Sequence, residues 1–158
     1  MRLYFLRHAD AVPGEPDEGR PLSELGIDQS RALGRFLRES HIAFDAAYSS
    51  PLVRARDTAE RVLEICNDTD PLLLQIAEPL GFGAAGSEFD RWMRSIPDEK
   101  HVLLVGHNPG LSDHVRRLTG GWPEEHFSFP KGGMVCLKTE DRRNFVWKFF
   151  LPPRLYLR

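Results

Sequence analysis

Short apolar runs alternate with amphipathic stretches along most of the chain. Residues 3–6 and 101–105 are the clearest runs, and the second is rich in Val and Leu without polar alternation. A run of that kind is typical of a strand that is covered on both faces. Residues 44–48 and 72–76 predict two further strands. Strands that alternate with helices in this way predict a mostly parallel sheet with helices on both faces.

The two longest amphipathic stretches predict the principal helices. The first follows Ser23, a suitable N-cap, and runs to about residue 39. The second carries one apolar stripe up to residue 66, as expected of a helix that packs against a sheet. For this helix we expect Ser50 as the cap and Pro51 as the first helical residue.

The last part of the chain departs from the alternation. Two shorter helices are predicted over residues 87–95 and 111–118. Residues 134–137 and 145–151 then form apolar runs separated by a charged turn, a pattern that predicts a β-hairpin. We therefore expect a three-layer α/β/α fold with a mostly parallel central sheet and a C-terminal hairpin, formed by residues 1–158 as a single domain.

Charge and composition narrow the function classes. The chain has 158 residues, with 21 Lys and Arg against 23 Asp and Glu, which argues against a surface built for nucleic acid or an anionic membrane. Its apolar runs are far shorter than the roughly 20 residues that a membrane span needs. The two cysteines, Cys66 and Cys136, match no CxxC or zinc spacing. We expect a soluble, cytoplasmic domain with no nucleic-acid or membrane partner.

Unusual polar groups follow three of the predicted strands. Arg7 and His8 follow the first strand, Arg54 lies shortly after the second, and His107 follows the run over 101–105. Ligands bind at the carboxyl ends of the strands in open α/β sheets. On the assumption that the three strands are neighbours, two histidines and two arginines converge on one crevice.

This set of side chains suits phosphoryl transfer. Two arginines offer forks of donors that match phosphoryl oxygens, and a neutral imidazole between them can accept the group covalently. A second, protonated imidazole would stabilise the charge of the transition state. The sequence contains no P-loop, no GxGxxG and no HExxH motif, and we expect neither a metal nor a cofactor.

Four segments in order resemble the motifs of the histidine phosphatase (phosphoglycerate mutase-like) superfamily. They are Arg7-His8-Ala9, Pro21-Leu22-Ser23 with Gly26 and Gln29, the helix start over 49–59, and Val105-Gly106-His107-Asn108-Pro109. Within the superfamily the chain is most similar to the short bacterial SixA-type phosphohistidine phosphatases. The features in common are its small size, the Arg20-Pro21-Leu22-Ser23 segment and the late Phe127-Ser128-Phe129-Pro130 segment.

The resemblance implies a role for each of the converging side chains. It implies that His8 is the nucleophile, that Arg7 and Arg54 clamp the phosphate, and that His107 is their electrostatic partner. It also places Arg20 at the edge of the site as a substrate contact. Ala9 stands where most members have Gly, so a methyl group lies near the phosphate site.

The general acid is the weakest part of the resemblance. Larger members place a Glu after the third strand, and Glu78 lies in that region, although a surface or capping carboxylate is the alternative interpretation. Asp10 is a second candidate. SixA-type members are thought to manage without this acid. The leaving group of a phosphohistidine is an imidazole that water can protonate, so its hydrolysis depends less on an enzyme acid.

We therefore expect a metal-independent phosphatase that hydrolyses phosphohistidine on a protein, such as a histidine phosphotransfer domain, through a covalent intermediate on His8. Two alternatives remain open. A phosphomonoesterase of the same superfamily would act on a small phosphate ester and would need Glu78 or Asp10 as its acid. A non-catalytic module would use the same pocket to bind a phosphorylated partner. A mutase is least favoured, because its bisphosphate intermediate calls for a closed pocket and the connection over residues 78–87 is too short for a sizeable lid.

Overall fold

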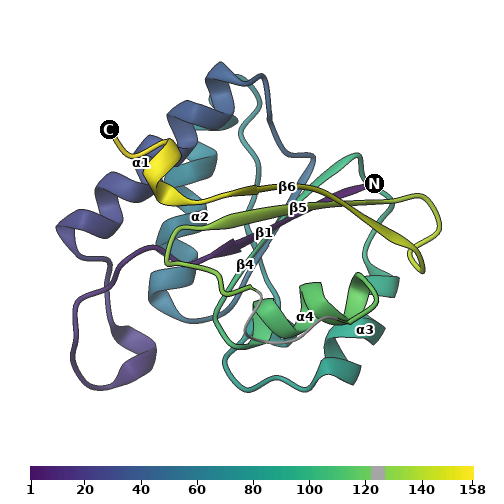
Figure 1. Ribbon diagram of the computed structural model, residues 1–158. Coiled ribbons are helices and arrows are strands. Elements are labelled where there is room, and N and C mark those ends of the chain that lie inside the picture. The colour runs from purple at the N-terminus through teal and green to yellow at the C-terminus, as the bar shows by residue number, and fades with distance from the viewer. Residues whose placement is uncertain (122–126) are drawn as a thin grey trace.

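A computed structural model describes residues 1–121 and 127–158 of the chain (Figure 1). Its strands are β1 (Arg2–Arg7), β2 (Ala46–Ser49), β3 (Gln75–Ile76), β4 (His101–Gly106), β5 (Met134–Thr139) and β6 (Phe145–Leu151). They form one six-stranded sheet in the order β3-β2-β4-β1-β5-β6. The first four strands run parallel to one another, whereas β5 is antiparallel to both of its neighbours, β1 and β6. The predicted mostly parallel sheet with a C-terminal hairpin is confirmed.

Helices cover both faces of this sheet. They are α1 (Glu24–Glu39), α2 (Val53–Cys66), α3 (Gly86–Ser95) and α4 (Gly110–Leu118), with short 3₁₀ turns η1 (Asp17–Gly19), η2 (Glu78–Leu80) and η4 (Pro153–Leu155). Helices α1 and α2 lie on one face, and α3 and α4 lie on the other (Figure 1). The three-layer α/β/α arrangement is therefore the one that the sequence pattern predicts.

Side chains of β1 show why the central strands lack polar alternation. Tyr4 and Leu6 pack into the core under α1 and α2, whereas Leu3 and Phe5 pack into the core under α3 and α4. Successive side chains of a strand point to opposite faces, so a strand between two helical layers needs apolar residues at every position. Burial on both faces fixes the position of β1, and of the residues that follow it.

Helix α1 begins as predicted, but α2 does not. The Ser23 hydroxyl accepts a hydrogen bond from Gly26 N at 3.1 Å and caps α1. Helix α2 begins at Val53 with Leu52 as its N-cap, so the prediction of Ser50 as cap and Pro51 as first helical residue was wrong. The fully buried Ser50 hydroxyl accepts a weaker bond from Leu52 N at 3.3 Å and contacts the His107 ring at 2.7 Å. Ser50 therefore contacts the candidate site as well as the start of the helix.

The predicted strand over 72–76 is reduced to the two residues of β3. Leu72 and Leu74 pack against the core under α1 and α2, whereas Leu73 between them is exposed. The packing of Leu72 and Leu74 therefore belongs to an extended segment that lacks a full ladder of strand hydrogen bonds. Within the described residues, no helix combines the length and the apolar character that crossing a membrane requires.

Candidate active site

The three strands that carry the unusual polar residues are neighbours in the order β2-β4-β1. Arg7 at the end of β1 is in register with Gly106 at the end of β4, and the next residue continues the contact, because His8 N donates to Gly106 O at 3.0 Å. The ring centroids of His8 and His107 are consequently 5.0 Å apart. The adjacency that the sequence argument assumed is present, and it brings the two histidines together.

His8 is held with one nitrogen engaged and the other available. The side chain is 6% exposed, and its Nδ1 lies 2.7 Å from the carbonyl oxygen of Ala9. A carbonyl can only accept, so Nδ1 carries the proton and Nε2 keeps its lone pair. Burial lowers the pKa of His8 to about 4; the Ala9 carbonyl opposes this shift, and the charges of Arg54 and Arg7 add to it. His8 is therefore a neutral imidazole at pH 7, as a nucleophile must be.

His107 is equally buried but has a different partner. Its side chain is 4% exposed, and Nε2 lies 2.7 Å from the Ser50 hydroxyl. That hydroxyl also accepts from Leu52 N, and its second lone pair and its proton allow it either to accept from His107 Nε2 or to donate to it. Burial lowers the pKa of His107 to about 3, with smaller contributions from the charges of His8 and Arg54. The expected protonated second imidazole is thus neutral in this structure.

The two arginines expected to clamp the phosphate both border this pair. Arg7 donates from Nη1 to Phe129 O at 2.7 Å, and the buried Arg54 donates to the backbone oxygen of Asp17 at 2.8 Å and to its carboxylate at 3.1 Å. Arg54, in the first turn of α2, is therefore paired with Asp17. The loop over 10–23 places Asp17 against it.

Buried donors remain unpaired at this point of the sheet. Among the described residues, the Nε atoms of Arg7 and Arg54 and Nδ1 of His107 are buried without a hydrogen-bond partner. Buried polar groups normally have partners, and an anion with several oxygens could accept from such donors together. The Nε atoms of Arg56 and Arg61 and Nδ1 of His114 are also unpaired, so it is the location of the first three beside His8 that points to a ligand.

Arg20 reaches the edge of the site through Asp17. Its Nε lies 2.9 Å from one carboxylate oxygen of Asp17, while the other oxygen receives Arg54. Asp17 therefore bridges the two arginines, and these hydrogen bonds lower its pKa. Asp17 was not predicted from the sequence; the available signal was an acidic side chain three residues before Arg20 in a loop next to the first histidine motif.

Thr58, which lies in the motif segment over 49–59, supports both sides of the site. Thr58 Oγ1 accepts from Ala9 N at 3.0 Å and donates to Arg54 O at 2.6 Å. It thereby ties the residue after His8 to the first turn of α2. The amide of Ala9 is committed to Thr58, and its methyl group is buried.

Neither candidate general acid is placed as a buried, protonated carboxyl group. Asp10 accepts from Ser23 Oγ at 2.6 Å and from Lys131 Nζ at 2.8 Å, and these bonds lower its pKa. An ionised carboxylate held in this way is a poor proton donor. Glu78 is exposed in η2 and does not line the cavity beside His107. The structure thus brings Arg7, His8, Arg54 and His107 together and leaves Glu78 on the surface.

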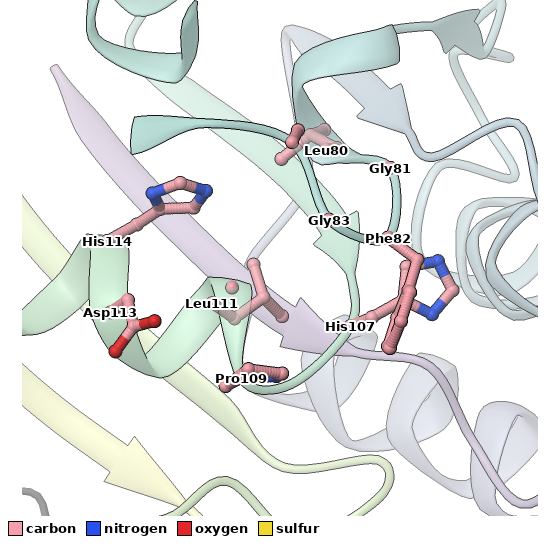
Figure 2. A pocket seen from close by; sticks show the side chains of 11 residues that line it. Leu80, Gly81, Phe82, Gly83, His107, Pro109, Leu111, Asp113 and His114 are labelled. Carbon is pink, nitrogen blue, oxygen red and sulfur yellow. The ribbon is translucent and has the colours of Figure 1, made fainter. Parts of the chain in front are cut away.

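A cavity of about 230 Å³ lies beside His107, between the connection from η2 to α3 and the start of α4 (Figure 2). Phe82 stands at its mouth, with its ring centroid 6.3 Å from that of His107. Phe82 was not predicted from the sequence; the signal was a large aromatic residue between two glycines in a connection rich in Gly, Ala and Pro. No group of three or more potential metal ligands occurs within residues 1–121 and 127–158.

Comparison with known proteins gives a family and full-length relatives. The family model described as histidine phosphatase superfamily (branch 1) matches residues 3–77. An uncharacterized protein of Picosynechococcus sp. is 32% identical over 90% of this chain and 88% of its own length. The phosphohistidine phosphatase SixA of Escherichia coli is 26% identical over 94% of this chain and 92% of its own. A structure of the protein histidine phosphatase SixA complexed with tungstate shares the fold, with a TM-score of 0.88, 22% identity, and coverage of 98% and 99% of the two chains.

Proposed function

The chain belongs to the histidine phosphatase superfamily, which supports phosphatase activity, and we propose that it hydrolyses phosphohistidine carried by another protein. The observation that carries the proposal is the neutral His8, whose Nε2 lone pair lies among buried donors while neither nearby carboxyl group is a suitable acid. The full-length similarity to a phosphohistidine phosphatase supports the choice of substrate. A histidine phosphotransfer domain of a signalling relay is a partner of the required chemistry.

In the first step, His8 Nε2 attacks the phosphorus of the substrate. The bond from phosphorus to the substrate imidazole breaks, and its electron pair returns to the leaving nitrogen. A proton reaches the imidazole from water. Positive charge develops on the His8 ring as Nε2 becomes bonded, and the hydrogen bond from Nδ1 to Ala9 O stabilises that charge. The product of this step is a phosphohistidine on His8.

The donors around His8 act on the phosphoryl oxygens during the transfer. Arg7 and Arg54 each present a buried Nε–H, and His107 presents Nδ1, which donates when the ring carries a proton there. Phosphoryl transfer depends mainly on positioning and on stabilising the charge of the equatorial oxygens, which such fixed donors provide. In the second step, water attacks the phosphorus, the bond to His8 Nε2 breaks, and phosphate leaves with the imidazole restored.

The arrangement of carboxylates favours a phosphoramidate over an alkyl phosphate. An alkoxide is a strongly basic leaving group and needs a proton in the transition state, whereas imidazole leaves as a weak base. Asp10 is engaged by Lys131 and Ser23, and Glu78 is exposed. The phosphomonoesterase alternative therefore lacks a suitable acid. The non-catalytic alternative does not explain why His8 is a neutral imidazole with a free lone pair on Nε2.

The test is phosphate release from a phosphohistidine-bearing protein and from p-nitrophenyl phosphate, for the wild type, His8→Ala and the control His41→Asn. His41 is exposed and has a φ of 54°, a conformation that Asn tolerates. We expect release from the phosphoprotein by the wild type and the control, and none by His8→Ala. Unchanged release by His8→Ala would contradict the mechanism. Release from the aryl phosphate alone would favour the phosphomonoesterase, and release from neither substrate would favour the binding module.

A further inference from the structure

Phe82 is a large apolar side chain that the fold leaves uncovered beside the site. It is 65% exposed, whereas Leu80 and Leu111, which line the same cavity, are buried. Its ring is oriented edge-to-face toward His107, with an angle of 78° between the ring planes. Figure 2 shows the two rings next to each other, with His114 and Asp113 at the far end of the cavity. Single exposed apolar residues are common, so it is this placement that requires an explanation.

The backbone around Phe82 holds the ring outward. Gly81 N donates to Glu78 O at 2.8 Å and closes the turn that ends η2. A Cβ at Gly81 would lie 2.9 Å from that same oxygen, so this position requires glycine. Gly83 on the other side has a φ of 79°, in the region that glycine adopts without strain. Backbone conformation therefore explains the two flanking glycines, whereas packing in the core does not explain the exposed aromatic side chain between them.

The position of His107 connects Phe82 to the chemistry. The His107 ring lies 5.0 Å from that of His8 and 6.3 Å from that of Phe82. His107 therefore lies next to both the nucleophile and the cavity that Phe82 lines, so a substrate ring held in that cavity would lie next to the Phe82 ring. Aromatic faces attract other rings and also cations, and a protonated imidazole has both properties.

From this juxtaposition we infer that Phe82 is a specificity-determining residue, which stacks against the imidazole ring of the substrate. The inference rests on the proposed function, since it names the part of the phosphohistidine that the side chain recognises. Phe82 would select substrates by the ring in their leaving group, whereas the arginines select the phosphoryl group. It covers no phosphoryl oxygen and takes no part in the bonds that form or break.

The test compares Phe82→Leu, which keeps an apolar side chain without a ring, with Phe82→Trp, which keeps an aromatic face. The substrates are free phosphohistidine, phosphoramidate and phenyl phosphate, so that the P–N bond and the ring vary separately, together with protein-borne phosphohistidine. An aromatic pair contributes about 0.5–1.5 kcal/mol, which corresponds to a roughly 2- to 12-fold change in KM. We expect that rise in Phe82→Leu for phosphohistidine and phenyl phosphate, with kcat unchanged, and wild-type values for phosphoramidate.

Phe82→Trp is expected to keep the wild-type KM for both ring-bearing substrates. Phe82 is exposed, so neither substitution disturbs the core. Equal KM values for Phe82→Leu and the wild type on phosphohistidine would overturn the inference, as would an equal loss on phosphoramidate. A loss confined to protein-borne phosphohistidine would also overturn it and would assign Phe82 to protein docking. Turnover of phenyl phosphate but not of phosphohistidine by the wild type would contradict the proposed function itself. Turnover of phosphohistidine with no effect of Phe82→Leu would contradict only the proposed ring contact.

Discussion

His8 and His107 follow neighbouring parallel strands and have nearly the same environment, but they differ in the group that each one faces. Both are buried, and burial lowers the pKa of His8 to about 4 and that of His107 to about 3. His8 directs Nδ1 at the carbonyl of Ala9, whereas His107 directs Nε2 at the hydroxyl of Ser50. A carbonyl only accepts a hydrogen bond, whereas a hydroxyl can donate or accept one. Hydrogen-bond partners can therefore separate the roles of two similar imidazoles.

The partner determines what each ring can do during a reaction. His8 can form a bond at Nε2 and keep its Nδ1 proton, because the Ala9 carbonyl stabilises the charged ring. His107 can gain a proton at Nε2 when a dianion arrives, because the Ser50 hydroxyl can turn from donor to acceptor. The comparison thus assigns covalent chemistry to His8 and charge stabilisation to His107.

The largest expected effect comes from removing the ring that faces the carbonyl. His8→Ala should lower kcat for phosphohistidine by roughly four orders of magnitude or more, because loss of a nucleophile removes the whole covalent route. Acid quenching with a labelled substrate should detect an acid-labile phosphoenzyme in the wild type and none in the variant. A phosphoenzyme that forms in His8→Ala would show that another side chain is the nucleophile.

Removing the ring that faces the hydroxyl should have a smaller effect of a different kind. His107→Ala should lower kcat by roughly 10²- to 10³-fold, the usual cost of one donor to a developing charge. Labelled phosphate should still become bound to His8, because the nucleophile and both arginines remain. Complete absence of the phosphoenzyme in His107→Ala would contradict the division of roles, since the two histidines would then act as one unit.

Acid pH tests whether His8 is as resistant to protonation as its burial implies. An ordinary histidine, with a pKa near 6.5, is only about 3% neutral at pH 5. With a pKa of about 4, His8 stays about nine-tenths neutral there, so kcat/KM should fall only below about pH 4. Spontaneous hydrolysis, measured with His8→Ala, is subtracted at each pH.

Protonation of the substrate phosphoryl group also changes the rate in this range. Two substrates with different phosphoryl pKa values distinguish the two effects. An acid limb that appears at the same pH in both profiles of kcat/KM reflects titration of the enzyme and not of the substrate. A common acid limb near pH 6.5 would show that His8 titrates as an exposed histidine and would remove the basis of the comparison.

The strand pattern was sufficient to predict the central sheet and the meeting of the two histidines. Residues 3–6 and 101–105 are apolar without alternation because helices cover both faces, and strand ends in register bring Arg7 beside Gly106. The family resemblance supplied the expected role of each side chain. These features follow from local sequence and from general rules of sheet topology.

Contacts between distant segments could not be predicted in the same way. Asp17 meets Arg54 across 37 residues, and Lys131 meets Asp10 across 121 residues. Neither pairing leaves a periodic signal, because each depends on how loops pass over the finished sheet. Ser50 was misassigned for a related reason: its hydroxyl has two partners, and only the helical one is visible in the sequence.

The smallest expected effect tests the hydroxyl itself. Ser50→Ala removes the hydrogen bond at Nε2 that orients the His107 ring, while leaving every proposed phosphate contact in place. A hydrogen bond of this kind contributes about 0.5–1.5 kcal/mol, so kcat should fall roughly 2- to 12-fold.

Ser49→Ala is a matched control, since Ser49 is equally buried but donates to the backbone oxygen of Ser50 at 2.9 Å. A merely structural role would lower stability in both variants alike and leave kcat unchanged in the folded protein. A fall in kcat confined to Ser50→Ala, with the acid limb of His8 unmoved, would show that the hydroxyl acts through His107 alone.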